Sequence, residues 1–246
     1  MKAMTEKFVS YEKEGHIVKI TLNRPDKLNA LNKDMVDSLY TAWQEFEQDK
    51  DARVAVITGE GKAFSAGVDI MNPTPVVRSV PGIGVEVTKP IIAAVNGHCV
   101  GVGLVIAFMA DIRIASEDAI FMYPEAKLGI TGGMGSLLAQ TIPLGIALEM
   151  LLVGDGISAQ RGYEIGLANH VVPNGTVLKE AMQMAEKIAN NAPLPVQALK
   201  KLARDTNIMQ STGVGMLVTS AISESADSQE GIQAFREKRK PVFIGK

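Results

Sequence analysis

Two glycine-containing turns and one glutamate are the residues of this sequence whose types and spacing could do chemistry. Residues 96 to 105 follow an apolar strand and open an apolar helix, so they leave free backbone N–H groups at a helix start. The turn at residues 64 to 69 follows another apolar strand and can supply a second donor. Glu125 offers a carboxylate in a weakly charged stretch. Two such donors and one carboxylate are enough to hold an enolate and move a proton.

Each of these features also has an ordinary structural explanation. Gly97, Gly101 and Gly103 can let a helix approach a strand closely, and their spacing matches neither the dinucleotide fingerprint nor a P-loop. Glu125 can be a surface carboxylate. A proline before it and a glycine four residues later favour a loop at a strand end, where catalytic groups are often placed. Apolar neighbours would raise its pKa and suit it to proton transfer.

The other reactive side chains are interpreted as structural. His98 and Cys99 are adjacent, and adjacent residues rarely face one another, so we interpret Cys99 as a core residue. Asp69 is expected to cap a following helix or to hydrogen-bond its own turn, and Asp111 to cap or orient the next strand. The sequence has no GxSxG, HExxH or CxxC motif, and its three histidines lie far apart in sequence. Serine hydrolysis and metal catalysis are therefore disfavoured, and no metal site is predicted.

The bulk composition excludes further classes. The 246 residues are 46% hydrophobic, which is enough for a sizeable core. The net charge of −2 and the interspersed lysines and arginines give no reason to expect nucleic acid or a membrane as partner. One cysteine fits a reducing compartment. No secretory signal or transmembrane run is visible in the sequence, so we predict a cytoplasmic location.

Strands alternating with helices must position these groups. The hydrophobic patterns predict strands at 16–22, 53–58, 89–95, 112–115, 119–122 and 169–172, and helices at 33–50, 101–110, 136–142, 146–153, 158–165 and 176–190. This order is typical of parallel βαβ units. Residues 191–195 are the best linker candidate, with helices at 196–206, 214–225 and 228–238 beyond it. We predict an α/β core at 1–190 and a helical segment at 191–246.

In combination, the motifs resemble the crotonase superfamily, also called the enoyl-CoA hydratase/isomerase family, over nearly the whole chain. The resemblance is carried by Asn23-Arg24-Pro25, Asn29-Ala30-Leu31, residues 61–69, residues 93–97, residues 110–115, residues 124–129, residues 154–159 and residues 235–240. It implies an α/β spiral of ββα units. It further implies that the helical C-terminal segment builds homotrimers, commonly paired into hexamers.

The resemblance also implies acyl-CoA substrates, with coenzyme A as part of the substrate and no metal or redox cofactor. The N–H groups of Val68 and Val102 would hold the thioester oxygen, and Glu125 would be the acid/base. The coenzyme A moiety would contact Lys27, Leu28, Ala30 and Ala66, with Phe235 and Lys238 closing over it, often from an adjacent subunit. The substrate pocket would be lined by Val105, Gly101 and Gly133.

Departures from the family pattern decide the chemistry we expect. Hydratases with two glutamates carry the second one where Val105 stands, and a single carboxylate suffices to carry a proton from C2 to C4. We therefore favour a Δ3,Δ2-enoyl-CoA isomerase. Val102 replaces the usual middle glycine and would narrow the pocket or turn the backbone. The stretch between Asp69 and Lys89 is short and proline-rich, which leaves the acyl-chain preference open.

Three other functions stay open. The chain could hydrate 2-enoyl-CoA with Glu125 alone. It could decarboxylate polyketide-type acyl thioesters, which the residues 133–135 and the apolar position 105 would tolerate. It could also be a non-catalytic acyl-CoA-binding protein, with Val102 and Val105 as signs of lost activity. Residues 130–132 hold no aspartate, which disfavours the dehalogenase and dienoyl-isomerase branches.

Overall fold

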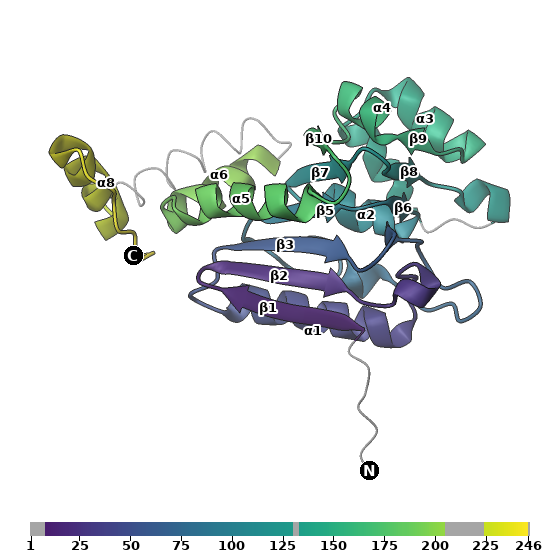
Figure 1. Cartoon of the computed structure of the whole chain (residues 1–246), viewed down its shortest axis with the longest axis horizontal. Coiled ribbons are helices and arrows are strands. Elements are labelled where there is room, and N and C mark those ends of the chain that lie inside the picture. Colours follow the sequence, from purple (N-terminus) through teal and green to yellow (C-terminus); the bar gives the residue numbers. More distant parts are fainter. Residues whose placement is uncertain (1–7, 130–132, 205–223, 246) are drawn as a thin grey trace, which may run out of the picture.

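Two sheets with strand-to-strand connections between them form the body of the molecule (Figure 1). The computed structural model describes residues 8–129, 133–204 and 224–245. The larger sheet has the order β1-β2-β3-β5-β7-β10, in which only the β1–β2 pair is antiparallel. Its strands are β1 (Val9–Glu14), β2 (Ile17–Leu22), β3 (Val54–Gly59), β5 (Ile91–Val95), β7 (Ile112–Ser116) and β10 (His170–Val172).

The smaller sheet has the order β4-β6-β8-β9. Its strands are β4 (Ala63–Ser65), β6 (His98–Val100), β8 (Ile120–Met122) and β9 (Ile157–Ser158). Three strands of the larger sheet are each followed directly by one of these short strands: β3 by β4, β5 by β6 and β7 by β8. This repeated step from one sheet to the other confirms the predicted α/β spiral. It also brings the ends of β4, β6 and β8 side by side.

Helices cover both faces of the larger sheet. The α-helices are α1 (Lys33–Gln48), α2 (Val102–Met109), α3 (Leu144–Val153), α4 (Ala159–Glu164), α5 (Val177–Ala189), α6 (Pro193–Arg204) and α8 (Ala226–Glu237). The 3-10 helices are η1 (Pro25–Lys27), η2 (Val77–Ser79), η3 (Glu125–Leu128) and η4 (Met134–Gln140). Within the described residues, no helix has both the length and the apolar content needed to cross a bilayer.

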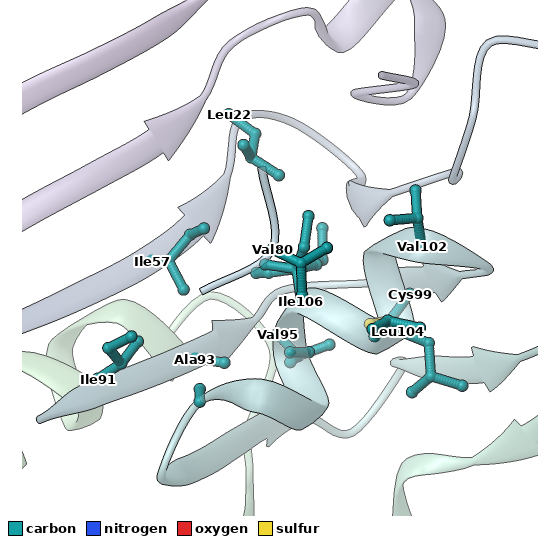
Figure 2. Close-up of a cluster of buried hydrophobic side chains, with 14 of the residues drawn as sticks. Leu22, Ile57, Val80, Ile91, Ala93, Val95, Cys99, Val102, Leu104 and Ile106 are labelled. Carbon is teal, nitrogen blue, oxygen red and sulfur yellow. The ribbon is translucent and has the colours of Figure 1, made fainter. Parts of the chain in front are cut away.

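Successive side chains along a strand point to opposite faces of the sheet, so strands that are buried on both faces contribute to two apolar clusters. On one face, Ala55 and Ile57 of β3 join α1 and α2 in one apolar cluster, which Figure 2 shows around Val80 and Ile106. On the other face, β3 contributes Val54 and Val56 to a second cluster with α5. Small alanines on α5 let this helix lie close to the sheet.

The structure differs from the predicted elements in several places, and the short strands β4, β6 and β9 are among the elements that were not predicted. Strand β1 was not predicted, because it is an edge strand with half of its residues exposed and polar; it pairs with β2 through a turn at Gly15, whose φ is 57°. Helix α6 begins at Pro193, so the predicted linker at 191–195 is wrong in its second half; proline suits the first turn of a helix. Residues 134–140 form a 3-10 helix, η4. The predicted helix at 214–225 lies almost wholly outside the described residues.

Candidate active site

The first predicted donor turn follows β4 and is held in a parallel bridge with Leu31. The N–H of Leu31 donates to the Gly67 carbonyl at 2.7 Å, and the N–H of Asp69 donates to the Leu31 carbonyl at 3.0 Å. In such a bridge the intervening N–H, that of Val68, points away from Leu31. It has no hydrogen-bond partner among the described residues. The Val68 amide is therefore available to an acceptor outside the chain.

The second donor turn lies directly against the first. Gly67 has a φ of 90°, and a Cβ added there would come within 3.7 Å of the Cα of Gly101. Gly103 leaves no room for a side chain, because its Cβ would lie 2.7 Å from the Cβ of Ser65. Val102 is the first residue of α2, where backbone N–H groups have no acceptor within the helix. The glycines therefore serve close packing between the two turns that carry Val68 and Val102.

Glu125 lies beside the second donor turn and follows the end of β8. It opens η3 after β8, and its Oε1 lies 2.8 Å from the position that a Cβ on Gly101 would take. Its other oxygen, Oε2, is buried and has no hydrogen-bond partner in the described part of the chain. Burial raises the pKa of the Glu125 carboxyl, while a hydrogen bond from its own backbone N–H lowers it less. The predicted rise in pKa is thereby confirmed.

The segment expected to contact coenzyme A is locked beside the first turn. Leu28 and Asn29 adopt left-handed conformations with φ of 49° and 57°, which cost energy outside glycine. The N–H of Ala66 donates to the Leu28 carbonyl at 2.8 Å. The buried Asn29 side chain donates to the Glu60 and Ala63 carbonyls at 2.9 and 2.8 Å. Lys27 and Leu28 remain exposed, and Ala30 and Ala66 are half-buried at the same edge.

Arg24 and Asp69 clamp the same edge. The guanidinium of Arg24 donates to the Asp69 carboxylate at 2.8 Å and to the Ala30 carbonyl at 3.0 Å. The Arg24 hydrogen bond holds the pKa of Asp69 below its usual range. Asp69 also accepts from the N–H groups of Met71 and Asn72. The prediction that Asp69 hydrogen-bonds its own turn is confirmed, whereas the part played by Arg24 was not predicted.

The other predicted site residues lie in α2, before η4 and at the end of α8. Val105 is buried in α2, and this helix contains no acidic residue. Gly133 is exposed, has a φ of 75° and lies directly before η4. Phe235 lies in α8, and Lys238 follows this helix directly and is exposed. Figure 1 shows α8 at the opposite end of the molecule from α2 and β6. Within one chain, the structure therefore does not bring Lys238 to Glu125.

The residues that we interpreted as structural lie in the core or hold neighbouring elements together. Cys99 is fully buried, and burial raises the pKa of its thiol, whereas His98 is exposed on β6. Asp111 accepts at 2.8 Å from the N–H of Ile91, the first residue of β5, so it holds the start of the neighbouring strand and not the next strand in sequence. It also pairs with Lys200 at 2.9 Å and fixes α6 on the body of the protein.

Tyr123 was not predicted as part of the site. Its hydroxyl accepts from the Gly135 N–H at 3.1 Å. In the sequence, only the closeness of Tyr123 to Glu125 could have indicated this role.

Comparisons with known proteins agree with this geometry. A family model described as enoyl-CoA hydratase/isomerase matches residues 12–76 and 84–246. The chain is 36% identical to the (E)-benzylidenesuccinyl-CoA hydratase of Thauera aromatica, over 96% of this chain and 99% of that protein. It is 36% identical to the carnitinyl-CoA dehydratase of Salmonella typhi, over 95% of this chain and 97% of that protein. A crystal structure of an enoyl-CoA hydratase from Mycobacterium tuberculosis superposes with a TM-score of 0.91, at 36% identity, over 98% of this chain and 100% of that one.

A half-buried carboxylate with a buried Oε2 beside the glycine turn that opens α2, on a two-sheet spiral, is an arrangement that suits acyl-thioester chemistry. The chain belongs to the enoyl-CoA hydratase/isomerase family, the crotonase superfamily, whose members act on coenzyme A thioesters. The family match is interrupted at 77–83, which includes all of η2. There the Trp43 indole N–H donates to the Ser79 carbonyl at 3.1 Å, so this divergent segment is fastened to α1.

Proposed function

We propose that this enzyme shifts the double bond of a 3-enoyl-CoA to the 2-position, as a Δ3,Δ2-enoyl-CoA isomerase. The observation that carries this proposal is the buried Oε2 of Glu125, which has no partner among the described residues, beside a helix α2 that contains no second carboxylate. Hydration gains from two carboxylates, since one orients water and the other transfers its proton. Isomerisation needs one base that first removes and then returns a proton.

The proposed reaction has two proton transfers at one carboxylate. The ionised Glu125 removes a proton from C2, and the electron pair of that C–H bond moves into a dienolate. The N–H groups of Val68 and Val102 stabilise the negative charge on the thioester oxygen, each by about 3 kcal/mol in the transition state. Glu125 then delivers the proton to C4, which yields the 2-enoyl thioester and restores the carboxylate. No metal or redox cofactor takes part in this proposal.

The surroundings of Glu125 support this role. Burial raises the pKa of Glu125 toward the working pH, which improves both removal and return of a proton. Gly101 leaves the carboxylate close to the amide of Val102, because a larger residue would occupy the space beside Oε1. In this proposal, C2 and its carbonyl lie between Glu125 and the two oxyanion donors.

Hydration of a 2-enoyl-CoA, or the reverse dehydration, is the second candidate. It is favoured by the names of the relatives, which include two enzymes called hydratase and one called carnitinyl-CoA dehydratase. In that reaction Glu125 would activate water by itself. Both candidates use the same donors and the same carboxylate, and they differ in whether water reaches Glu125.

Binding of the coenzyme A moiety is assigned to the edge formed by Lys27, Leu28, Ala30 and Ala66. The left-handed backbone at Leu28 supports this assignment, since strained residues cluster at functional sites. Lys238 lies beyond α8, so its contact with the same coenzyme A requires a second copy of the chain. We therefore include a homotrimer or a hexamer in the proposal. We also propose a reducing, cytoplasmic compartment.

Turnover of two substrates by purified protein tests the proposal. We expect a trans-3-enoyl-CoA to be converted to the trans-2-enoyl-CoA faster than a trans-2-enoyl-CoA is hydrated, across several chain lengths. Glu125→Gln should abolish the isomerisation, because the amide cannot accept the proton. Glu186→Gln, an exposed carboxylate on α5, is the matched control and should leave turnover unchanged.

Deuterium exchange separates the two candidates further. Proton return by Glu125 predicts partial retention of a label from C2 at C4, because the buried carboxyl exchanges slowly with water. Efficient hydration with little isomerisation would favour the second candidate, and turnover of both substrates by Glu125→Gln would remove the role of this carboxylate altogether.

A further inference from the structure

Tyr123 connects the strand end that carries Glu125 to the 3-10 helix η4. It lies two residues before Glu125, and its side chain is buried, with 5% exposed. Its hydroxyl oxygen accepts from the backbone N–H of Gly135 at 3.1 Å. Gly135 is the second residue of η4, so this bond ties η4 to the segment that precedes Glu125.

The ring of Tyr123 fills the space that a side chain at position 135 would need. A Cβ on Gly135 would lie 2.5 Å from Cζ and 2.6 Å from Cε1 of Tyr123, and 2.7 Å from Cδ2 of Leu151. Real Cβ atoms do not approach so closely, so a side chain at position 135 would have to displace the Tyr123 ring or the Leu151 side chain. The η4 backbone therefore lies directly on the tyrosine ring, with α3 behind it.

Glu125 itself is held by its segment rather than by hydrogen bonds to Oε2. On one side, Gly154 packs on Pro124, with 3.2 Å between its added Cβ and the proline Cα, and Lys127 pairs with Asp155. On the other side, Tyr123 supplies the contact with η4. The position and the dryness of the carboxylate therefore depend on these neighbours.

We propose that Tyr123 is a positioning residue whose hydroxyl and ring hold η4 against the segment that carries Glu125, exclude water from that carboxylate, and so favour isomerisation over hydration. This inference rests on the function proposed above and names the residue that decides between its two outcomes. Tyr123 need not touch the substrate to act in this way, because it acts on the access of water to Glu125.

Among the described residues, few charges lie near this carboxylate. Neither α2 nor the described residues of η4 contain a charged side chain. Lys127 is engaged with Asp155, and Glu149 of α3 is exposed. Exclusion of water is consequently the main influence on Glu125, and burial is the largest cause of its raised pKa. A change in packing at Tyr123 should therefore be visible in the titration of Glu125.

Tyr123→Phe tests the inference, because it removes the acceptor of the Gly135 N–H and keeps the ring. We expect the ratio of isomerised to hydrated product to fall by about two- to tenfold, the range set by loss of one hydrogen bond, mainly through kcat rather than KM. Carbon-13 NMR of protein labelled at glutamate Cδ, with Glu125→Gln for assignment, should show a lower pKa for Glu125 in the variant.

Two further variants complete the test. Gly135→Ala should change both readouts in the same direction and more strongly, since its Cβ displaces the Tyr123 ring. Tyr163→Phe removes an exposed hydroxyl on α4 and should change neither. A folded Tyr123→Phe with the wild-type product ratio and the wild-type Glu125 titration overturns the inference. If wild-type protein only hydrates, the isomerase proposal fails, yet the titration of Glu125 still decides the role of Tyr123.

Discussion

Replacement of Gly101 by alanine tests whether the meeting of the glycine turn and Glu125 is the centre of the site. Gly101 has φ 55° and ψ −123°, a conformation that residues with a Cβ rarely adopt. Strain of this kind costs about 1–3 kcal/mol. For a protein of this size, each kcal/mol lowers the melting temperature by roughly 2–4 °C.

The added methyl group also acts directly on the chemistry. Its carbon would lie 2.8 Å from Oε1 of Glu125 and 3.8 Å from the Cα of Gly67, so the carboxylate must move. Displacement of a reacting group by about 1 Å can reduce the rate by roughly 100-fold. We therefore expect Gly101→Ala to lose on the order of 100-fold in kcat/KM while remaining folded.

A second glycine separates strain from displacement. Gly175 has a φ of 79°, and a Cβ added there would have no neighbour within 4 Å. Gly175→Ala should therefore lose stability through strain alone and retain full activity. The assay pairs thermal unfolding with turnover of 3-enoyl-CoA and 2-enoyl-CoA for both variants. If Gly101→Ala matched Gly175→Ala in both melting temperature and turnover, our account of the site would be refuted.

Three further predictions follow from buried groups. Burial raises the pKa of Glu125 in the folded state above its ordinary value of about 4.3, so activity should fall as the pH drops through this raised pKa. At pH values above the raised pKa the buried charge destabilises the folded state. There, and not at lower pH, Glu125→Gln should unfold at a higher temperature than wild type, as calorimetry across pH would show. Asn29→Ala removes the donor that the buried Asn29 side chain supplies to the Ala63 and Glu60 carbonyls, so urea unfolding should show a loss of about 1–3 kcal/mol; an unchanged midpoint would contradict this. Val105→Glu places a carboxylate on the buried helix α2, so it should raise hydration relative to isomerisation and lower the stability of the fold. A folded variant with an unchanged product ratio would argue against control of the reaction by position 105.

Elements whose sequence patterns are local were predicted correctly. The apolar strands β3 and β5 and the amphipathic helix α1 lie where the periodicity predicted them, within a few residues. Asn32 at the start of α1 and Ser158 at the start of α4 each cap a helix with a side-chain oxygen. Such signals depend on neighbours in the chain, so a single sequence displays them. The motifs likewise identified the family before any fold was known.

Some elements could not be predicted because their cause is distant in sequence. Strand β1 reads as a polar, half-exposed stretch, and its pairing with β2 is what makes it a strand. Pro193 reads as part of a linker, yet the helix it opens is fixed on the body by the pairing of Lys200 with Asp111. Packing decided these cases against local preference.

The site shows the same division. Glu125 and the two glycine turns were predicted from residue types and spacing, but only the tertiary structure decided that Oε2 is buried without a described partner and that Oε1 lies beside Gly101. The contact of Tyr123 with Gly135 has no signature in sequence, since it depends on η4 folding back over the end of β8. A sequence can name the chemical groups of a site. Their separation, and the water that reaches them, depend on packing between segments far apart in the chain.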